Sequence, residues 1–345
     1  MSPEPLLSVS DLQVGFATEG GLLQAVDGVN FELRPGEVLA IVGESGSGKS
    51  VTAQTIMGLT RGHNSRIEGS VQLDGEELLT AGDAAMRKLR GERIAMVFQD
   101  PMTSFNPVYR LGAQIVEAIR AHRPDTSKAD ARARVVELFD SVGIPEAERR
   151  VDDYPHEFSG GMRQRAMIAM ALALEPEVLI ADEPTTALDV TIQAQILRLL
   201  EDLNRERNLA TILITHDLGV VAEVADRVLV MYAGKVVEQG TLDEIFYDPQ
   251  HPYTWGLLGS LTRLDRPRPK RLPQISGAPP SLLELPEGCP FRPRCPHEFS
   301  KCTQVPGLEA RLPDAPKHCD RCWLTPEQKR EKRHVEGQIG LEAPA

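Results

Sequence analysis

Short apolar runs alternate with amphipathic stretches along the first three quarters of the chain. This alternation predicts an α/β domain, because strands and helices that follow one another in turn build a parallel sheet covered by helices. The run at 178–181 has four apolar residues in succession, which is typical of a strand buried on both faces of a parallel sheet. The other predicted strands are 12–16, 37–42 and 211–215, and the predicted helices are 51–59, 162–174 and 190–200.

The pattern changes near residue 265. The segment 266–281, RPRPKRLPQISGAPPS, is rich in proline, which disfavours helix interiors and central strands and therefore predicts an extended linker. We expect one large domain at 1–265 and a small extension at 266–345 that contains all five cysteines. The charged, Gly- and Pro-containing end after Trp323 predicts a disordered tail.

Composition narrows the class of protein. A net charge of -12 over 345 residues argues against a surface that neutralises phosphate backbones, so nucleic acid is not expected as a partner. No stretch approaches the roughly 20 apolar residues needed to cross a bilayer. The first residues, MSPEPLLSVSDLQ, lack the basic and apolar regions of a secretory signal, so we expect a cytoplasmic protein.

A glycine-rich loop, GESGSGKS at 43–50, lies between the predicted strand at 37–42 and the predicted helix at 51–59. In this context the glycines let backbone N–H groups turn inward around phosphate oxygens at a helix N-terminus. Lys49 is placed to reach the β- and γ-phosphates of a nucleotide, and Ser50 to offer a hydroxyl to Mg²⁺. The predicted nucleotide-binding residues of this segment are Gly43, Ser45, Gly46, Gly48, Lys49, Ser50 and Val51.

Two carboxylates, Asp182 and Glu183, end the buried strand predicted at 178–181. At the carboxyl end of a strand beside the phosphate loop, Asp182 is placed to hold the water shell of Mg²⁺. Glu183 is placed to polarise a water molecule in line with the γ-phosphorus. A strand that ends in Asp-Glu is commonplace by itself, and the phosphate loop upstream is what favours the functional interpretation.

A second anion cradle is predicted at Ser159, Gly160 and Gly161, which precede the predicted helix at 162–174. Ser159 is a natural N-cap, and the two glycines leave backbone N–H groups accessible at the helix N-terminus. An ordinary capped helix is the alternative. A single nucleotide rarely needs two cradles from one chain.

These motifs resemble, in the same order, those of the ATP-binding subunits of ABC transporters, over residues 6–265. The resemblance implies a P-loop ABC ATPase domain, with a RecA-like core and antiparallel β and helical subdomains. It also implies a second ATPase subunit, because the Ser-Gly-Gly signature of one subunit closes over the ATP held by its partner. Phe158 and Met162 stand where the wider family has leucine and glutamine, as they do in its peptide-importer branch.

The same resemblance assigns further roles. Gln99 matches the loop residue that contacts Mg²⁺ or the attacking water, and His216 matches the histidine that orients water and glutamate at the γ-phosphate. Asp189 matches a loop that crosses the dimer interface, although it also precedes a predicted helix and is a natural helix cap. Phe16 matches the aromatic residue that stacks on adenine, with packing into the core as the alternative.

The segment 251–255, HPYTW, and the cysteine-containing segment 288–302 resemble the extension of dipeptide and oligopeptide importer ATPases. This implies a peptide importer with two transmembrane permease subunits, a second ABC ATPase, which is related or identical, and an extracytoplasmic solute-binding protein. The expected location is the cytoplasmic face of the inner membrane. Nickel or another small solute is the alternative cargo. An ABC ATPase of DNA or ribosomes, or a redox-sensing module, are alternatives outside transport.

Clustered cysteines in a cytosolic chain indicate a metal site more often than a disulfide. Four thiolates can hold a [4Fe–4S] cluster or Zn²⁺. By resemblance to peptide-importer relatives, the predicted ligands of a [4Fe–4S] cluster are Cys289, Cys295, Cys302 and Cys322, with Cys319 as an extra residue. Zinc and free reduced thiols remain alternatives, because the spacing of the residues does not select the metal.

Overall fold

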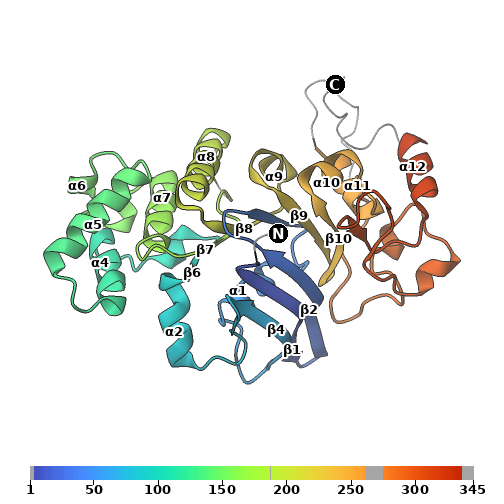
Figure 1. Cartoon of the computed structure of the whole chain (residues 1–345), viewed down its shortest axis with the longest axis horizontal. Helices are drawn as coiled ribbons and strands as arrows, with labels where there is room; N and C mark the ends of the chain where they lie inside the picture. The colour runs from blue at the N-terminus through green and yellow to red at the C-terminus, as the bar shows by residue number, and fades with distance from the viewer. Residues whose placement is uncertain (1–3, 187, 262–274, 336–345) are drawn as a thin grey trace. The chain divides into compact units, whose positions relative to one another are not determined.

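The computed structural model describes residues 4–186, 188–261 and 275–335 (Figure 1). Its chain divides into two compact units. The first unit combines residues 33–38 and 80–214 with the N-terminal residues 1–6. The second unit combines residues 7–32, 39–79 and 215–345.

Parallel strands form the centre of the first unit. β6 (Ile94–Val97) pairs with β7 (Val178–Asp182), which pairs on its other side with β8 (Ala210–Thr215). All residues of these strands are buried. The prediction of a strand covered on both faces at 178–181 is therefore confirmed, and Asp182 and Glu183 lie at its carboxyl end, as expected.

Helices make up the rest of the first unit. α7 packs against α5 and against β6, and the two predicted helices at 162–174 and 190–200 correspond to α7 and α8. α8 runs seven residues beyond its predicted end and stops at Asn208, whose φ of 51° is the left-handed conformation of a helix C-cap. The helices are α2 (Asp83–Glu92), α3 (Pro101–Ser104), α4 (Leu111–His122), α5 (Lys128–Ser141), α6 (Ala147–Arg150), α7 (Gly160–Ala171) and α8 (Val190–Arg207).

An antiparallel sheet with the strand order β2-β1-β4-β5 lies in the second unit (Figure 1). The same unit holds a mixed set of strands in which β3 pairs in parallel with β9, and β9 pairs antiparallel with β10. The predicted strands at 12–16 and 37–42 fall within β1 and β3. The strands are β1 (Leu7–Thr18), β2 (Gly21–Leu33), β3 (Val38–Val42), β4 (Ser65–Leu73), β5 (Glu76–Glu77), β9 (Arg227–Tyr232) and β10 (Lys235–Thr241).

Helices of the second unit come between and after its strands along the chain. The predicted helix at 51–59 is α1, which begins two residues earlier, directly at Lys49. The helices are α1 (Lys49–Ile56), α9 (Leu218–Val224), α10 (Leu242–Tyr247) and α11 (Pro252–Gly259). Among the described residues, no helix has both the length and the apolar character that crossing a bilayer requires.

The cysteine-containing extension is built onto the edge of β10. β12 (Cys319–Asp320) pairs antiparallel with β10, and β11 (Glu309–Ala310) pairs with β12. The boundary predicted near residue 265, and most of the proline-rich segment after it, lie outside the described residues. The division at residue 265 therefore stays a prediction.

A helix, α12 (Pro326–Val335), occupies part of the predicted disordered tail, so that prediction is wrong for these residues. The fully buried Lys329 donates from Nζ to Asp320 Oδ1 over 2.7 Å, and Arg333 pairs with Asp248. These ion pairs hold a highly charged helix against the protein, which its composition by itself does not indicate. Residues 336–345 lie outside the described part of the chain.

Candidate nucleotide site

The predicted phosphate loop connects β3 to α1 in a conformation that requires its glycines. Gly43, Gly46 and Gly48 have φ values of 153°, 78° and 104°. A Cβ atom at Gly43 would lie 2.2 Å from the carbonyl oxygen of Met231, and one at Gly48 would lie 2.5 Å from that of Ala25. At Gly46 a Cβ atom would meet nothing within 4 Å, so the loop is open at its tip, where a ligand can approach.

The N-terminus of α1 offers an anion its backbone N–H groups. Gly48 is the N-cap residue, no side chain caps the helix, and its first turn contains no acidic residue. Lys49, whose relative exposure is 5%, donates from Nζ to the carbonyl oxygens of Gly43 and Glu44 over 2.7 and 3.0 Å. The half-buried Ser50 follows in the first turn. A positive charge and a helix N-terminus are thus gathered at one loop.

In the first unit, Glu183 is held by two hydrogen bonds to a single carboxylate oxygen. Gln99 donates from Nε2 to Glu183 Oε2 over 2.9 Å, and Thr186 donates from Oγ1 to the same atom over 2.8 Å. The φ of Glu183 is 47°, an uncommon left-handed conformation for a residue with a side chain. Asp182, before it, is 3% exposed. Glu183 is therefore oriented by neighbours and by a strained backbone, as catalytic side chains often are.

The predicted second cradle is a capped helix N-terminus. Ser159 accepts a hydrogen bond at Oγ from the backbone N–H of Met162 over 3.3 Å. Gly160 is exposed, and a Cβ atom there would meet only Leu188 at an ordinary 3.7 Å, whereas one at Gly161 would lie 2.6 Å from Ile192. Phe158, which replaces the family's usual leucine, is buried and packs its ring on Phe139.

His216 and Asp189 both lie at the ends of elements. His216 is exposed and directly follows β8, while Asp217 after it caps α9 by accepting from the N–H of Gly219 over 2.8 Å. Asp189 caps α8, because its Oδ1 accepts from the N–H of Ile192 over 3.0 Å. The helix-cap alternative for Asp189 is thus observed, and its role at a dimer interface stays a prediction.

Phe16 is half-buried on β1, opposite Ser65 of β4. Its ring is therefore not enclosed in the core, which leaves adenine stacking open as a prediction.

Two residues of the site were not predicted from the sequence. Thr186, which binds Glu183, was not predicted, although its place three residues after that carboxylate was an available signal. Glu44, the second residue of the phosphate loop, was not predicted as a site residue, and it is bound by Arg294 and Tyr253 from distant parts of the chain. Contacts between residues that are more than 200 positions apart leave no local pattern.

Four of the cysteines line one cavity in the second unit, together with His251, His297 and Phe291. The four are Cys289, Cys295, Cys302 and Cys322. Cys319 lies instead on β12, opposite Gln239 of β10. The structure thus groups the four predicted ligands and separates the fifth cysteine from them.

The cavity thiols are strongly desolvated. Burial raises the pKa of Cys295 and of Cys322 to about 12, and it also raises the pKa of Cys289. All five cysteines are free of disulfides. Among the described residues, no three His, Cys, Asp or Glu side chains are arranged to hold a metal ion. The donor set, four thiols in one cavity, is the type that suits a four-thiolate group.

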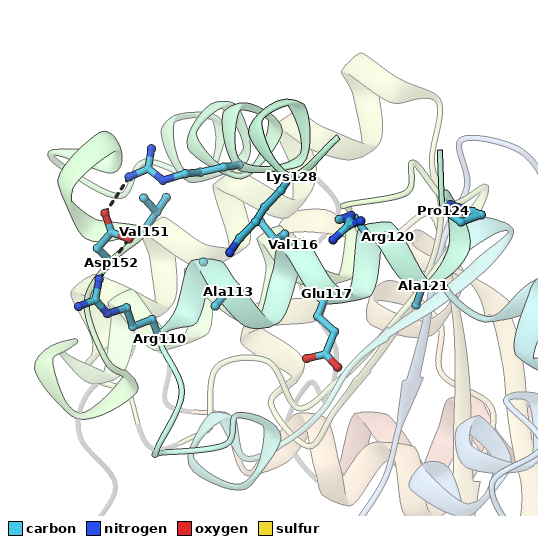
Figure 2. A pocket seen from close by; sticks show the side chains of 12 residues that line it. Arg110, Ala113, Val116, Glu117, Arg120, Ala121, Pro124, Lys128, Val151 and Asp152 are labelled. Atoms are coloured by element: carbon cyan, nitrogen blue, oxygen red, sulfur yellow. Dashed lines mark hydrogen bonds and ion pairs between the residues drawn. The ribbon is translucent and has the colours of Figure 1, made fainter. Parts of the chain in front are cut away.

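A separate cavity of about 810 Å³ lies beside α4 and α5 in the first unit (Figure 2). Asp152 lies at its rim between two guanidinium groups, 3.5 Å from Arg110 Nη1 and 2.7 Å from Arg132 Nη2. Arg120, Lys128 and Glu117 also line it. It includes none of the predicted nucleotide-binding residues.

Comparison with known proteins identifies two regions of the chain. Residues 26–186 match the ABC transporter family, and residues 237–302 match the oligopeptide/dipeptide transporter C-terminal region. The chain is 54% identical over 321 residues to an oligopeptide transport ATP-binding protein, OppD, of Salmonella typhimurium, covering 92% of this chain and 95% of that protein. It is 53% identical over 323 residues to a dipeptide transport ATP-binding protein, DppD, of Bacillus subtilis, covering 93% and 95%.

Solved structures are also similar. A dimeric ATP-binding cassette in a post-hydrolysis state, bound to ADP and Pi, is 28% identical with a TM-score of 0.62, and the match covers 68% of this chain and 98% of that one.

Proposed function

Because the chain belongs to the family of ABC transporter ATP-binding subunits, we propose that it is the ATP-hydrolysing subunit that powers import of dipeptides or oligopeptides. The observation that carries the cargo class is the match of residues 237–302 to the oligopeptide/dipeptide transporter C-terminal region. The phosphate loop supports ATP binding, and the oriented Glu183 supports ATP hydrolysis.

We assign nucleotide binding to the phosphate loop. Backbone N–H groups at the N-terminus of α1 hold the phosphates, and Lys49 exchanges its two carbonyl partners for the β- and γ-phosphate oxygens. Phe16 stacks on the adenine. When bound, Mg²⁺ neutralises charge that develops on the phosphates, and Ser50, Asp182 and Gln99 are the residues that would hold it or its water shell.

Hydrolysis is assigned to Glu183, which polarises the attacking water. The two donors on Glu183 Oε2 orient the carboxylate, as a general base that activates a water molecule requires. His216 orients the water and the glutamate at the γ-phosphate. Gln99 binds Glu183 in the described conformation, so a change at the nucleotide is passed to the segment that follows β6.

The partners follow from this assignment. Ser159, Gly160 and Gly161 close over the nucleotide of a second ABC ATPase subunit, so that ATP binding closes the dimer and hydrolysis reopens it. Phe98, Val108 and Tyr109, in the segment around and after Gln99, are 40%, 71% and 59% exposed, which supports docking of this segment on the permease subunits. We place the protein at the cytoplasmic face of the inner membrane, with an extracytoplasmic binding protein delivering the peptide.

We also propose that Cys289, Cys295, Cys302 and Cys322 hold a [4Fe–4S] cluster. The support is their common cavity, which excludes Cys319. Burial raises the pKa of Cys289, Cys295 and Cys322, so these three thiols must release their protons to bind metal, and loading is favoured at higher pH. Protein purified without oxygen should contain iron and acid-labile sulfide. Zinc in place of iron, or no metal, would overturn this assignment.

The function is tested by capturing the protein from detergent-solubilised native membranes under anaerobic conditions and identifying what accompanies it. We expect two multi-span permease subunits, a second ATPase and a peptide-binding protein. Recovery of a binding protein for nickel or another small solute would overturn the cargo class. Recovery of only ribosomal or nucleic-acid partners would overturn the transport function and leave the ATPase.

A further inference from the structure

Glu44, the second residue of the phosphate loop, is bound at three of its groups. Its carboxylate accepts two hydrogen bonds from Arg294, from Nη1 to Oε2 over 2.5 Å and from Nη2 to Oε1 over 2.9 Å. Its backbone N–H donates to the hydroxyl of Tyr253 over 2.8 Å, and its carbonyl oxygen accepts from Lys49. Two of these partners, Tyr253 of α11 and Arg294 of the extension, lie in the part of the chain, 237–302, that matches the transporter C-terminal region.

Arg294 is held rigidly for this contact. Its side chain is 5% exposed, and it donates from Nε to the carbonyl oxygen of Ser276 over 3.0 Å and from Nη2 to that of Gly277 over 3.2 Å. Its guanidinium carbon lies 5.8 Å from the centre of the Tyr232 ring. The hydrogen bond with Glu44 raises the pKa of Arg294, so the guanidinium stays charged. A planar guanidinium fixed in this way matches a carboxylate at two points, which a lysine cannot do.

Aromatic packing links the two contacts of Glu44, with Tyr253 and with Arg294, to the docking of the extension. The Phe291 ring lies 5.3 Å from the Tyr232 ring and 5.4 Å from the Tyr253 ring. Phe291 is 2% exposed, and it also lines the cavity that contains the four cysteines. The extension therefore orders Tyr253 through Phe291 and supplies Arg294 itself.

The charge of Glu44 explains why the loop needs this partner. ATP brings several negative charges to the phosphate loop, and a carboxylate in the loop opposes them. The Glu44 side chain is 27% exposed, so solvent screens it only in part. The bidentate partner neutralises this carboxylate.

We propose that Arg294 is a positioning residue for ATP binding, through which the C-terminal extension neutralises Glu44 and fixes the start of the phosphate loop. This inference rests on the nucleotide-binding role proposed for that loop. The extension then contributes to the nucleotide site, and its undocking weakens ATP binding by the phosphate loop.

The test uses the full-length protein and measures steady-state hydrolysis and equilibrium binding of MgATP. Arg294→Met should raise KM and Kd for ATP about tenfold or more and change kcat by less than about threefold, because the lost interaction acts on ground state and transition state alike. Arg294→Lys should lie between it and wild type. Arg292→Ala is the matched control, since Arg292 lies in the same turn but pairs with Glu298, and it should change KM less than about twofold.

The decisive variant combines Arg294→Met with Glu44→Gln. If Arg294 acts by neutralising the carboxylate, the double variant should return KM to within about threefold of Glu44→Gln alone. If Arg294 only supports the fold, the double variant stays as weak as Arg294→Met, which would overturn the proposal. Equal KM values for Arg294→Met and Arg292→Ala would overturn it as well.

Tyr253→Phe keeps the ring packing and removes the hydroxyl, so it tests the second contact without risk to the fold. It should raise KM about threefold, and an unchanged KM would remove Tyr253 from the proposal.

If Lys49→Ala hydrolyses ATP as fast as wild type, the proposed role of the phosphate loop itself fails. A loss of activity in Lys49→Ala together with an unaffected Arg294→Met would refute this inference alone.

Discussion

Gln99 Nε2 donates a hydrogen bond to Glu183 Oε2 over 2.9 Å, although the two residues are 84 positions apart in the sequence. The contact joins the second residue after β6 to the first residue after β7, and these two strands are parallel neighbours. It gives the carboxylate a fixed orientation and ties it to the exposed segment that contains Val108 and Tyr109. Five predictions follow from this and the other observed contacts.

Glu183→Gln should retain ATP binding and trap the closed ATPase dimer, because the amide preserves size and hydrogen bonding but cannot accept the proton of water. A positioned general base contributes about 10²- to 10⁴-fold, so phosphate release should fall by at least about 100-fold. Phosphate release and ATP-dependent dimerisation by size-exclusion chromatography check this. Glu206→Gln, on the exposed surface of α8, is the control. An unchanged hydrolysis rate in Glu183→Gln would remove this residue from the chemistry.

Lys49→Ala should weaken or abolish nucleotide use, since it removes the cation that the phosphate loop holds beside its open tip. Equilibrium titration with a fluorescent ATP analogue and a hydrolysis assay measure the effect. Lys88→Ala removes a charge from an exposed position on α2 and should behave as wild type. Turnover that survives Lys49→Ala would show that 43–50 is not the phosphate loop.

Gly160→Ala should weaken ATP-dependent dimerisation without lowering the stability of the fold. The added methyl group meets only ordinary contact at 3.7 Å, so the thermal unfolding midpoint should stay near that of wild type. The same methyl group obstructs the approach of a partner's phosphates to this backbone, so ATP-dependent dimerisation and hydrolysis should fall while ATP binding to the monomer persists. Wild-type dimerisation in this variant would argue that Ser159–Gly161 is merely a capped helix.

His251→Asn should flatten the dependence of stability on pH. Burial lowers the pKa of His251 to about 4, opposed by the charge of Glu238 and assisted by that of Lys329. Between about pH 6.5 and pH 4 the unfolded chain therefore binds a proton that the folded chain does not. Stability falls by about 1.4 kcal/mol for each pH unit of acidification across this window, and stops falling below the folded pKa.

Asparagine keeps an N-cap acceptor where His251 Nδ1 now accepts from the N–H of Tyr253, while it removes the titration. Urea unfolding of wild type and variant at pH 7, 6 and 5 measures the difference in slope. Parallel curves for the two proteins would mean that His251 titrates alike in the folded and unfolded states.

Cys322→Ser should lower the iron and acid-labile sulfide content of protein purified without oxygen, because it removes one of four thiols that share a cavity. Cys319→Ser is the matched control, three positions earlier on β12, and should keep the full content. Equal loss in the two variants, or loss in Cys319→Ser alone, would mean that the ligand set has been assigned wrongly.

The sequence by itself determined the local elements of this protein. Apolar runs of three or more residues predicted β3, β7 and β8, and glycines at 43, 46 and 48 predicted a loop that their positive φ values confirm. These features can be predicted because each restricts the residue type locally. Burial on both faces of a strand favours consecutive apolar residues, and a left-handed backbone conformation favours glycine. The order of the motifs also indicated the family.

Tertiary structure alone decided which distant residues meet. The ordering of α12 depends on Lys329 and Asp320, and composition indicated disorder there because a charged segment gains order only where partners bury and pair its charges. Likewise Arg294 reaches Glu44 across 250 positions, through backbone carbonyls and aromatic rings that fix its place. The local sequence pattern depends on whether a segment is buried or sharply bent, because both conditions restrict which residues are tolerated. A contact between two distant segments forms only when the fold brings both to the same point, so neither segment indicates it by its own sequence.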